Sequence, residues 1–116
     1  MIDDATVEAF NSRFTVDLNN FKKFTPSQRD RVKKYGSDAE ALLKNRELAL
    51  FVHHFKFDLA DSLITILGHS PDDNSRRVSI ANQLTAMDGF ITSLKRAVML
   101  RNRVIEWEAR PQDSGQ

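Results

Sequence analysis

Four polar residues at helical spacing are the candidates for metal chemistry in this chain: His53, His54, Asp58 and Asp61. His54 and Asp58 are one helical turn apart, which would place two ligands on one face of a helix. A metal site in a helical bundle also takes acids or histidines from a facing helix, and the last helical segment offers only Asp88 near its middle. We therefore predict no metal ion, and we interpret the four side chains as the polar, solvent-facing or oligomer-facing side of a mostly apolar helix.

Nucleophilic and phosphate-transfer chemistry lacks the residue patterns that it requires. The chain has no cysteine, its serines and threonines stand without a histidine and an acid at a recognisable spacing, and its four glycines form no phosphate-binding loop. We therefore expect a protein that is not an enzyme and that carries no cofactor. The lack of cysteine also excludes disulfides and fits a reducing compartment.

Basic side chains gather beside the starts of two expected helices, where a phosphate group would be stabilised. Lys22 and Lys23 precede Thr25, the expected cap of one helix, and Arg76 and Arg77 fall in the first turn of the last helix. The free backbone N–H groups and the dipole of a helix start favour an anion. If folding or assembly brings the two starts together, they form a paired phosphate site. The alternative is ordinary capping with solvated charges.

Charge is segregated along the chain, although the net charge is only +1. Residues 22–34 carry six basic residues against one acid, and a second basic stretch covers residues 95–103. Such patches attract anionic ligands, unless they are solvated helix faces paired with acids elsewhere. A pI near 8.1 and the lack of helix-turn-helix spacing disfavour duplex nucleic acid, so a compact anionic ligand is the better fit.

The N-terminus gives no sign of export. Its first four residues include two aspartates where a signal peptide would be basic, and no uncharged run approaches the roughly 20 residues that span a bilayer. We expect no membrane association and a cytoplasmic location, in the host cytoplasm if the chain is viral.

Capping signals predict where the first helices begin. Asp3 or Asp4 caps a short helix that ends near Phe14. Thr25, followed by a proline and by Gln28 three positions later, caps a second helix that begins at the proline.

A further helix is expected over residues 38–67. Gly36 predicts a kink or a short break just before it. Gly68 is expected to end it in the left-handed conformation, and Pro71 to prevent its resumption. The last helix then runs to about Ala109, and the short connection makes the two long helices antiparallel neighbours.

Two apolar stripes predict the seam between these long helices. One stripe comprises Leu48, Val52, Phe55, Leu59 and Ile66. The other comprises Ile80, Leu84, Met87, Ile91, Leu94 and Val98. Alternating steps of three and four keep such a stripe facing a single partner helix along its length.

The segment from 48 to 67 carries more apolar surface than one neighbouring helix covers. Leu50, Phe57 and Ile64 form an outer stripe at period seven, which we predict to be an oligomer interface. The N-terminal aromatic residues are expected to cover part of this surface, and a symmetric copy of the chain the rest. They are Phe10, Phe14, Phe21 and Phe24.

These patterns together predict an all-α fold. We expect a long antiparallel helical hairpin with short N-terminal helices, assembled as an oligomeric helical bundle. Residues 1–110 should form a single helical domain, and residues 111–116 a disordered tail.

Four short segments resemble the small phage anti-CBASS sponges. The segments are Leu18–Phe21, Phe24–Pro26, Ala39–Leu43 and Ser75–Ala81, the last followed by Leu84. Proteins of this family are compact helical oligomers that sequester the cyclic di- and trinucleotides of bacterial immune signalling without altering them. Phe24 and Thr25 occupy the aromatic and histidine places of the family's aromatic-His-x-Pro element, and residues 45–65 look like an insertion.

The resemblance implies roles for individual residues of this chain. It implicates Phe24 as a base-stacking surface, and Lys22, Lys23, Arg76 and Arg77 as phosphate contacts. One hypothesis is therefore an oligomeric protein that sequesters a cyclic oligonucleotide or a similar phosphate ligand, to counter host immune signalling. The other hypothesis, from a different class, is a helical adaptor or inhibitor that binds a protein partner through its apolar hairpin.

Overall fold

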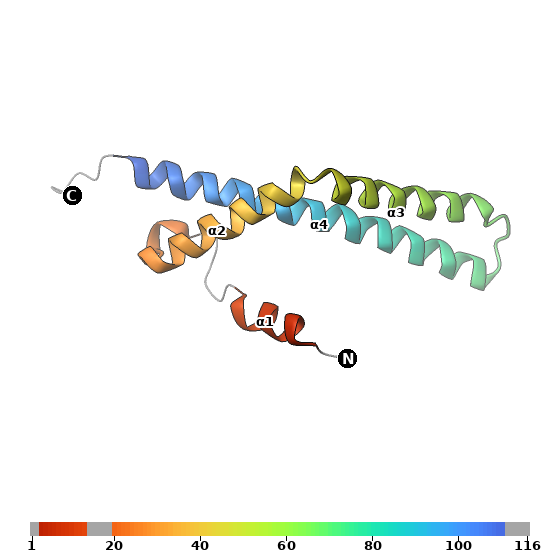
Figure 1. Cartoon of the computed structure of the whole chain (residues 1–116). Coiled ribbons are helices and arrows are strands. Elements are labelled where there is room, and N and C mark those ends of the chain that lie inside the picture. The colour runs from red at the N-terminus through yellow and green to blue at the C-terminus, as the bar shows by residue number, and fades with distance from the viewer. Residues whose placement is uncertain (1–2, 14–19, 111–116) are drawn as a thin grey trace.

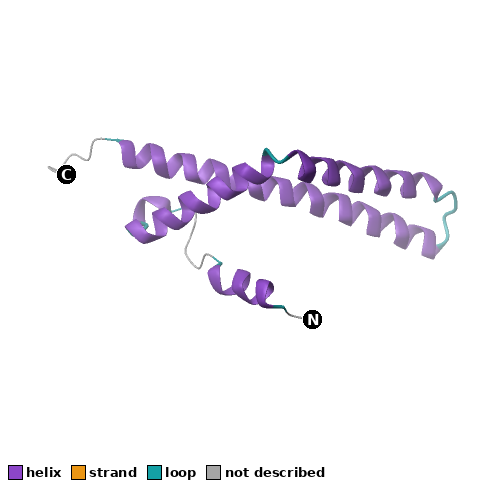
Figure 2. Ribbon diagram, in the orientation of Figure 1, coloured by secondary structure: helices purple, strands orange, loops and turns teal. Residues whose placement is uncertain are grey.

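The computed structural model describes residues 3–13 and 20–110, and its elements are helical (Figures 1 and 2). In chain order they are α1 (Asp4–Ser12), the short 3-10 helix η1 (Phe21–Lys23), α2 (Pro26–Leu43), α3 (Arg46–Thr65) and α4 (Pro71–Ala109). No strand occurs among the described residues, and the all-α prediction is confirmed. Phe14 and the expected tail at 111–116 lie outside the described residues, and the extent of the domain stays a prediction.

The long helix α4 is the axis of the molecule, and two other helices lie against different halves of it (Figure 1). Its 39 residues span about 58 Å at 1.5 Å per residue. α2 packs against its C-terminal half and α3 along its N-terminal half. The body measures 69 × 30 × 27 Å, and its radius of gyration of 19.8 Å exceeds the roughly 13 Å of a compact chain of this length.

The start of α2 is the one that its sequence predicts. The Thr25 hydroxyl accepts a hydrogen bond from the Gln28 backbone N–H at 3.2 Å. The Gln28 side-chain oxygen accepts one from the Thr25 N–H at 2.9 Å, which completes the capping box.

Gly36 does not interrupt α2, so the predicted short break is wrong, and a kink at this position stays a prediction. The helix continues through this position, where it crosses α4 closely. A Cβ atom on Gly36 would lie 2.7 Å from the carbonyl oxygen of Ala97 and would also overlap the Cβ of Arg101. The glycine is therefore required by close packing of two helices and not by a turn.

The helix is interrupted at Lys44 and Asn45. The single helix expected over residues 38–67 is therefore divided between α2 and α3. Asn45 determines the position of the break, because its side-chain oxygen accepts a hydrogen bond from the Leu48 N–H at 2.7 Å. This bond satisfies a donor that the start of a helix leaves free.

The connection between α3 and α4 is held by an arginine and not by a left-handed glycine. Gly68 does not have the positive φ that was expected of it. Instead Arg77 donates hydrogen bonds to the carbonyl oxygens of Ile66, at 3.1 Å, and of Gly68. Pro71, expected to block a helix, is the first residue of α4, and Ser70 caps it.

The buried side chains form three small clusters along α4. The first contains Phe24, Val32 and Val104, the second Ala39, Leu94 and Ala97, and the third Leu59, Ile66 and Ile80. The α4 stripe from Ile80 to Val98 is buried or half-buried throughout, so its inward orientation is confirmed. The prediction that this stripe faces a single partner helix is wrong, because Leu94 packs against α2 whereas Ile80 packs against α3.

The pairing of α3 with α4 is visible in two contacts. The Lys56 ammonium lies 2.9 Å from the Asp88 carboxylate, and further along α3 Leu59 packs with Ile80. Phe55 is the one member of the α3 stripe that stays exposed.

The N-terminal aromatic residues that the structure describes do not cover α3, contrary to expectation, and Phe14 lies outside the described residues. Phe10 is exposed on α1, which has no extensive contact with the other described helices. Phe21 and Phe24 pack near the C-terminal end of α4, beside Val104. Within the described residues, the side of α3 that points away from α4 has no cover.

Candidate functional site

The predicted phosphate-binding residues lie at opposite ends of the molecule. Lys22 and Lys23 belong to η1, which packs beside the C-terminal end of α4, whereas Arg76 and Arg77 are near its N-terminus. The length of α4 separates the two groups by on the order of 40 Å. One chain does not bring them together, so a paired site would require a second chain.

Phe24 and Thr25 have structural roles in this chain. Phe24 is only 6% exposed and belongs to the core with Val32 and Val104, so its ring presents no free face to a base. The Thr25 hydroxyl is engaged by the Gln28 N–H at the start of α2. The burial of Phe24 does not support the base-stacking role that the resemblance implied, and that role stays a prediction.

Arg76 and Arg77 are engaged within the start of α4. Arg76 pairs with Asp73 at 2.7 Å, and this hydrogen bond is the main cause that lowers the pKa of the Asp73 carboxyl. Arg77 donates to the side-chain oxygen of Asn74 at 2.9 Å, besides the two loop carbonyls that it holds. Local spacing showed these arginines beside a helix start but gave no sign of their partners.

Two side chains of the first basic stretch, Arg29 and Lys33, join α2 to α4. Glu108 accepts hydrogen bonds from Lys33 at 2.8 Å and from Arg29 at 2.9 Å. The bond from Lys33, followed by that from Arg29, lowers the pKa of the Glu108 carboxyl. The Arg29 guanidinium also donates to the Phe24 carbonyl at 2.7 Å and lies 5.2 Å from the centre of the Trp107 ring.

The second basic stretch contributes one more bridge between these helices. Arg101 donates to Glu40 at 2.6 Å, and this bond is the first cause of a lowered pKa of the Glu40 carboxyl, ahead of Lys44. The two residues are 61 positions apart, so no local pattern reveals the pair. The interpretation of the basic stretches as helix faces paired with acids elsewhere therefore holds for these side chains.

A row of exposed apolar side chains lies on the outer face of α3. Leu50, Phe57 and Ile64 are 44%, 66% and 73% exposed. At about 100° per residue, Phe57 points roughly 160° away from Leu59, the buried residue that faces α4. A spacing of seven keeps the three side chains in line, so the predicted outer stripe exists as a surface and its use as an interface stays a prediction.

Aromatic and polar groups border this row. Phe51 is 76% exposed and contributes, with four neighbours from α3, to a surface hollow of about 550 Å³. The other lining residues are Leu50, His54, Phe55 and Asp58. On the opposite side of the row the His53 ring stacks on Phe57, with 6.4 Å between the ring centres.

The four candidate metal ligands of α3 are exposed. They are His53, His54, Asp58 and Asp61. Among the residues that the structure describes, no three histidine, cysteine or carboxylate side chains gather as a metal ion requires. Asp88, the acid expected to face them, is engaged by Lys56.

A second candidate site is a groove of about 430 Å³ where α2, α3 and α4 meet. Its apolar lining includes Leu43, Leu48, Val52 and Ile91. Its polar lining includes His53, Lys56, Asp88 and Lys95. Apolar walls beside basic groups suit a small anion with a flat apolar part. Sequence reasoning missed this groove because the break at Asn45, which opens it, was not foreseen.

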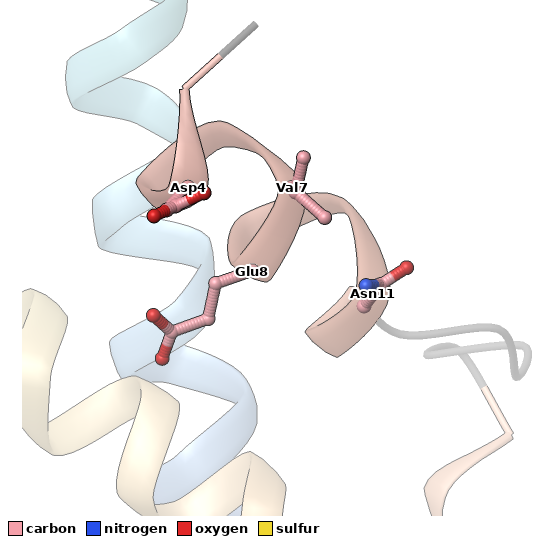
Figure 3. Close-up of a pocket in the computed structure, with 4 residues that line it drawn as sticks. All are labelled: Asp4, Val7, Glu8 and Asn11. Atoms are coloured by element: carbon pink, nitrogen blue, oxygen red, sulfur yellow. The ribbon is translucent and has the colours of Figure 1, made fainter.

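A third hollow lies on α1 and is lined by Asp4, Val7, Glu8 and Asn11 (Figure 3). Among the residues that the structure describes, all four lining side chains come from this one short helix. The hollow is therefore a surface depression, and two carboxylates beside it give it no chemistry of its own.

Comparisons with protein-family models, with curated proteins and with solved structures found no match to this chain. None of the described helices combines the length and the apolar character that crossing a lipid bilayer requires.

Proposed function

We propose that this protein is a non-enzymatic helical binding protein that associates with another amphipathic helix through the outer face of α3. The observation that carries the proposal is the exposed row of Leu50, Phe57 and Ile64 on a helix whose opposite side is packed against α4. A helix that is apolar on two sides requires a partner on each side. Full burial of one such side chain contributes about 1.5 to 3 kcal/mol, so three of them make a substantial contact.

In this proposal α3 and α4 form a long antiparallel hairpin that presents the row to its partner. The Lys56–Asp88 pair and the packing of Leu59 with Ile80 support the hairpin. The row occupies one position in each seven, which is the repeat of a helix–helix seam. The protein would thus act as an adaptor or inhibitor, and its hairpins would assemble as a helical bundle.

The proposal is tested by capture of partners from a host lysate with three forms of the chain. Phe57→Asp should lose the partner that the wild type retains, because an unpaired carboxylate at the seam is costly. Val78→Asp is the matched control, since Val78 is 58% exposed but belongs to α4. Equal retention by wild type and Phe57→Asp would contradict the proposal.

A second function, sequestration of a cyclic oligonucleotide or a similar phosphate ligand, is favoured by the groove between α2, α3 and α4. The groove offers Lys95 beside apolar walls, together with Lys56, which is paired with Asp88, and it does so in one chain, unlike the predicted residues at the two helix starts. Ligand would be held there without turnover, so as to counter host immune signalling. Lys22, Lys23, Arg76 and Arg77 would contribute only if a second chain brought them together.

Calorimetric titration with cyclic di- and trinucleotides separates this second function from the first. Binding that Lys95→Glu weakens at least tenfold, with Phe57→Asp unaffected, would support the groove. Absence of heat with every member of the panel, for a chain that circular dichroism shows to be folded, would eliminate this function.

A further inference from the structure

The outer face of α3 fits one particular helix, which is α3 itself. We infer that two chains associate through their α3 helices, antiparallel, about a two-fold axis that passes near Phe57. This inference rests on the proposed function, because it names the helix that the outer face takes.

The chain exposes more surface than a compact monomer of its mass. The chain exposes 9076 Å², whereas a compact monomer of 13.3 kDa exposes about 6,500 Å². A standard interface removes roughly 800 Å² from each partner, so the surplus accommodates at least one.

The row is symmetric about its central residue. Leu50 and Ile64 each lie seven positions from Phe57. When a second α3 lies antiparallel across the row, Leu50 meets the partner's Ile64 and Phe57 lies at the axis. The same patch then serves both chains, as a two-fold interface requires. The outer face points away from α4, so α4 does not obstruct the approach.

The polar residues beside the row also complement themselves. His54 and Asp61 lie on the same flank, about 60° and 40° from the direction of Phe57. In an antiparallel pair the same flank of both helices borders the same side of the interface. His54 therefore meets the partner's Asp61, and Asp61 meets the partner's His54, so an imidazole N–H can donate to a carboxylate twice.

A parallel arrangement lacks this complementarity. It would bring the flank of Asp61 against the partner's opposite flank, where Lys56 lies about 100° from the row and is already bonded to Asp88 of its own chain at 2.9 Å, so Asp61 gains no cationic partner. Asp58 lies about 100° from the row, too far round the helix to enter either interface. The charges of α3 thus favour the antiparallel arrangement.

Light scattering coupled to size exclusion tests the association with the full-length chain. Wild type and Val78→Asp should elute at twice 13.3 kDa, and Phe57→Asp at 13.3 kDa with unchanged helix content by circular dichroism. Dissociation should become easier by on the order of a hundredfold in Phe57→Asp. A wild-type chain that is monomeric at 50 µM, or a Phe57→Asp chain that stays dimeric, would overturn the inference.

A mixing experiment tests the antiparallel register. In His54→Asp, each of the two contacts between positions 54 and 61 places a carboxylate against a carboxylate. In Asp61→Lys, each contact places an ammonium group against an imidazole. Each variant alone should therefore dimerise more weakly than wild type. A mixture of the two variants places opposite charges at both contacts. Native mass spectrometry should therefore find heterodimers in excess of the statistical half, and a statistical distribution would overturn the antiparallel arrangement.

The outcomes distinguish this inference from the proposed function. If wild type is monomeric and Phe57→Asp still loses a captured helical partner, the outer face binds a foreign helix and only the self-association is wrong. If Phe57→Asp changes neither the mass nor the captured partner, both are wrong.

Discussion

The two halves of α4 are packed very differently, although one apolar stripe runs through both. At the C-terminal half, α2 crosses so closely that Gly36 admits no Cβ atom, and two acidic residues receive ion pairs from the opposite helix. At the N-terminal half, α3 contributes one small buried cluster and the single exposed pair of Lys56 with Asp88. The two contacts therefore differ in kind: α2 is held tightly against α4, whereas α3 is packed on one side and leaves its outer face exposed.

The largest effect is expected from adding one methyl group where α2 crosses α4. Gly36→Ala should lower the free energy of unfolding by about 1 to 2 kcal/mol, because overpacking outweighs the better helix propensity of alanine. Gly89→Ala is the matched control, since nothing lies within 4 Å of its added Cβ. It should raise the free energy of unfolding by about 0.5 to 1 kcal/mol. Urea denaturation at one fixed protein concentration measures both, and a stabilised Gly36→Ala would contradict the close crossing.

Hydrogen exchange compares the local stability of α3 with that of α2 within one molecule. In the Phe57→Asp variant, backbone amides of residues 50–58 should exchange at least about tenfold faster than those of residues 32–39, a difference of about 1.4 kcal/mol in opening free energy. The weaker packing of α3 is the reason. Equal protection of the two segments would mean that α2 and α3 open together, which would contradict the difference in packing between them.

Acid provides the mildest perturbation. The folded chain lowers the pKa of Glu108 from its usual 4.5, so the stability that this carboxylate contributes is present above about pH 4.5 and is lost as pH falls through the lowered pKa. Glu108→Gln should lower the thermal midpoint at pH 7 and have a progressively smaller effect below pH 4. Glu106→Gln serves as the control, because Glu106 pairs only along α4 with Arg110, at 3.4 Å. A constant difference between wild type and Glu108→Gln from pH 7 to pH 3 would contradict the role of the carboxylate.

Local features were predictable from the sequence, and long-range ones were not. The cap at Thr25 depends on residues within one turn, and the stripe of α4 depends on a period that every packed helix obeys. Gly36 was misread because a glycine that ends a helix and one that admits a crossing helix look alike in a single sequence. The crossing is defined by Ala97, which is far away in the chain.

The candidate site residues also include a group that was predictable from the sequence and a group that was not. The outer row of Leu50, Phe57 and Ile64 follows from a surplus of apolar residues on one helix, and that is a local count. The phosphate site at two helix starts required knowledge of which end of α4 each start adjoins. Nothing in residue spacing fixes that, because it depends on where α2 docks.

The contact between α2 and α4 also has a consequence in time. Lys33 and Glu108 are 75 positions apart, so α2 leaves the ribosome long before the residues that hold it. At about 5 to 20 residues per second, the delay is roughly 4 to 15 seconds. During that interval the apolar side of α2, with Val32 at its centre, has no α4 to pack against. A nascent chain of this protein should therefore depend on chaperones more than its small size suggests, and slower translation should increase that dependence.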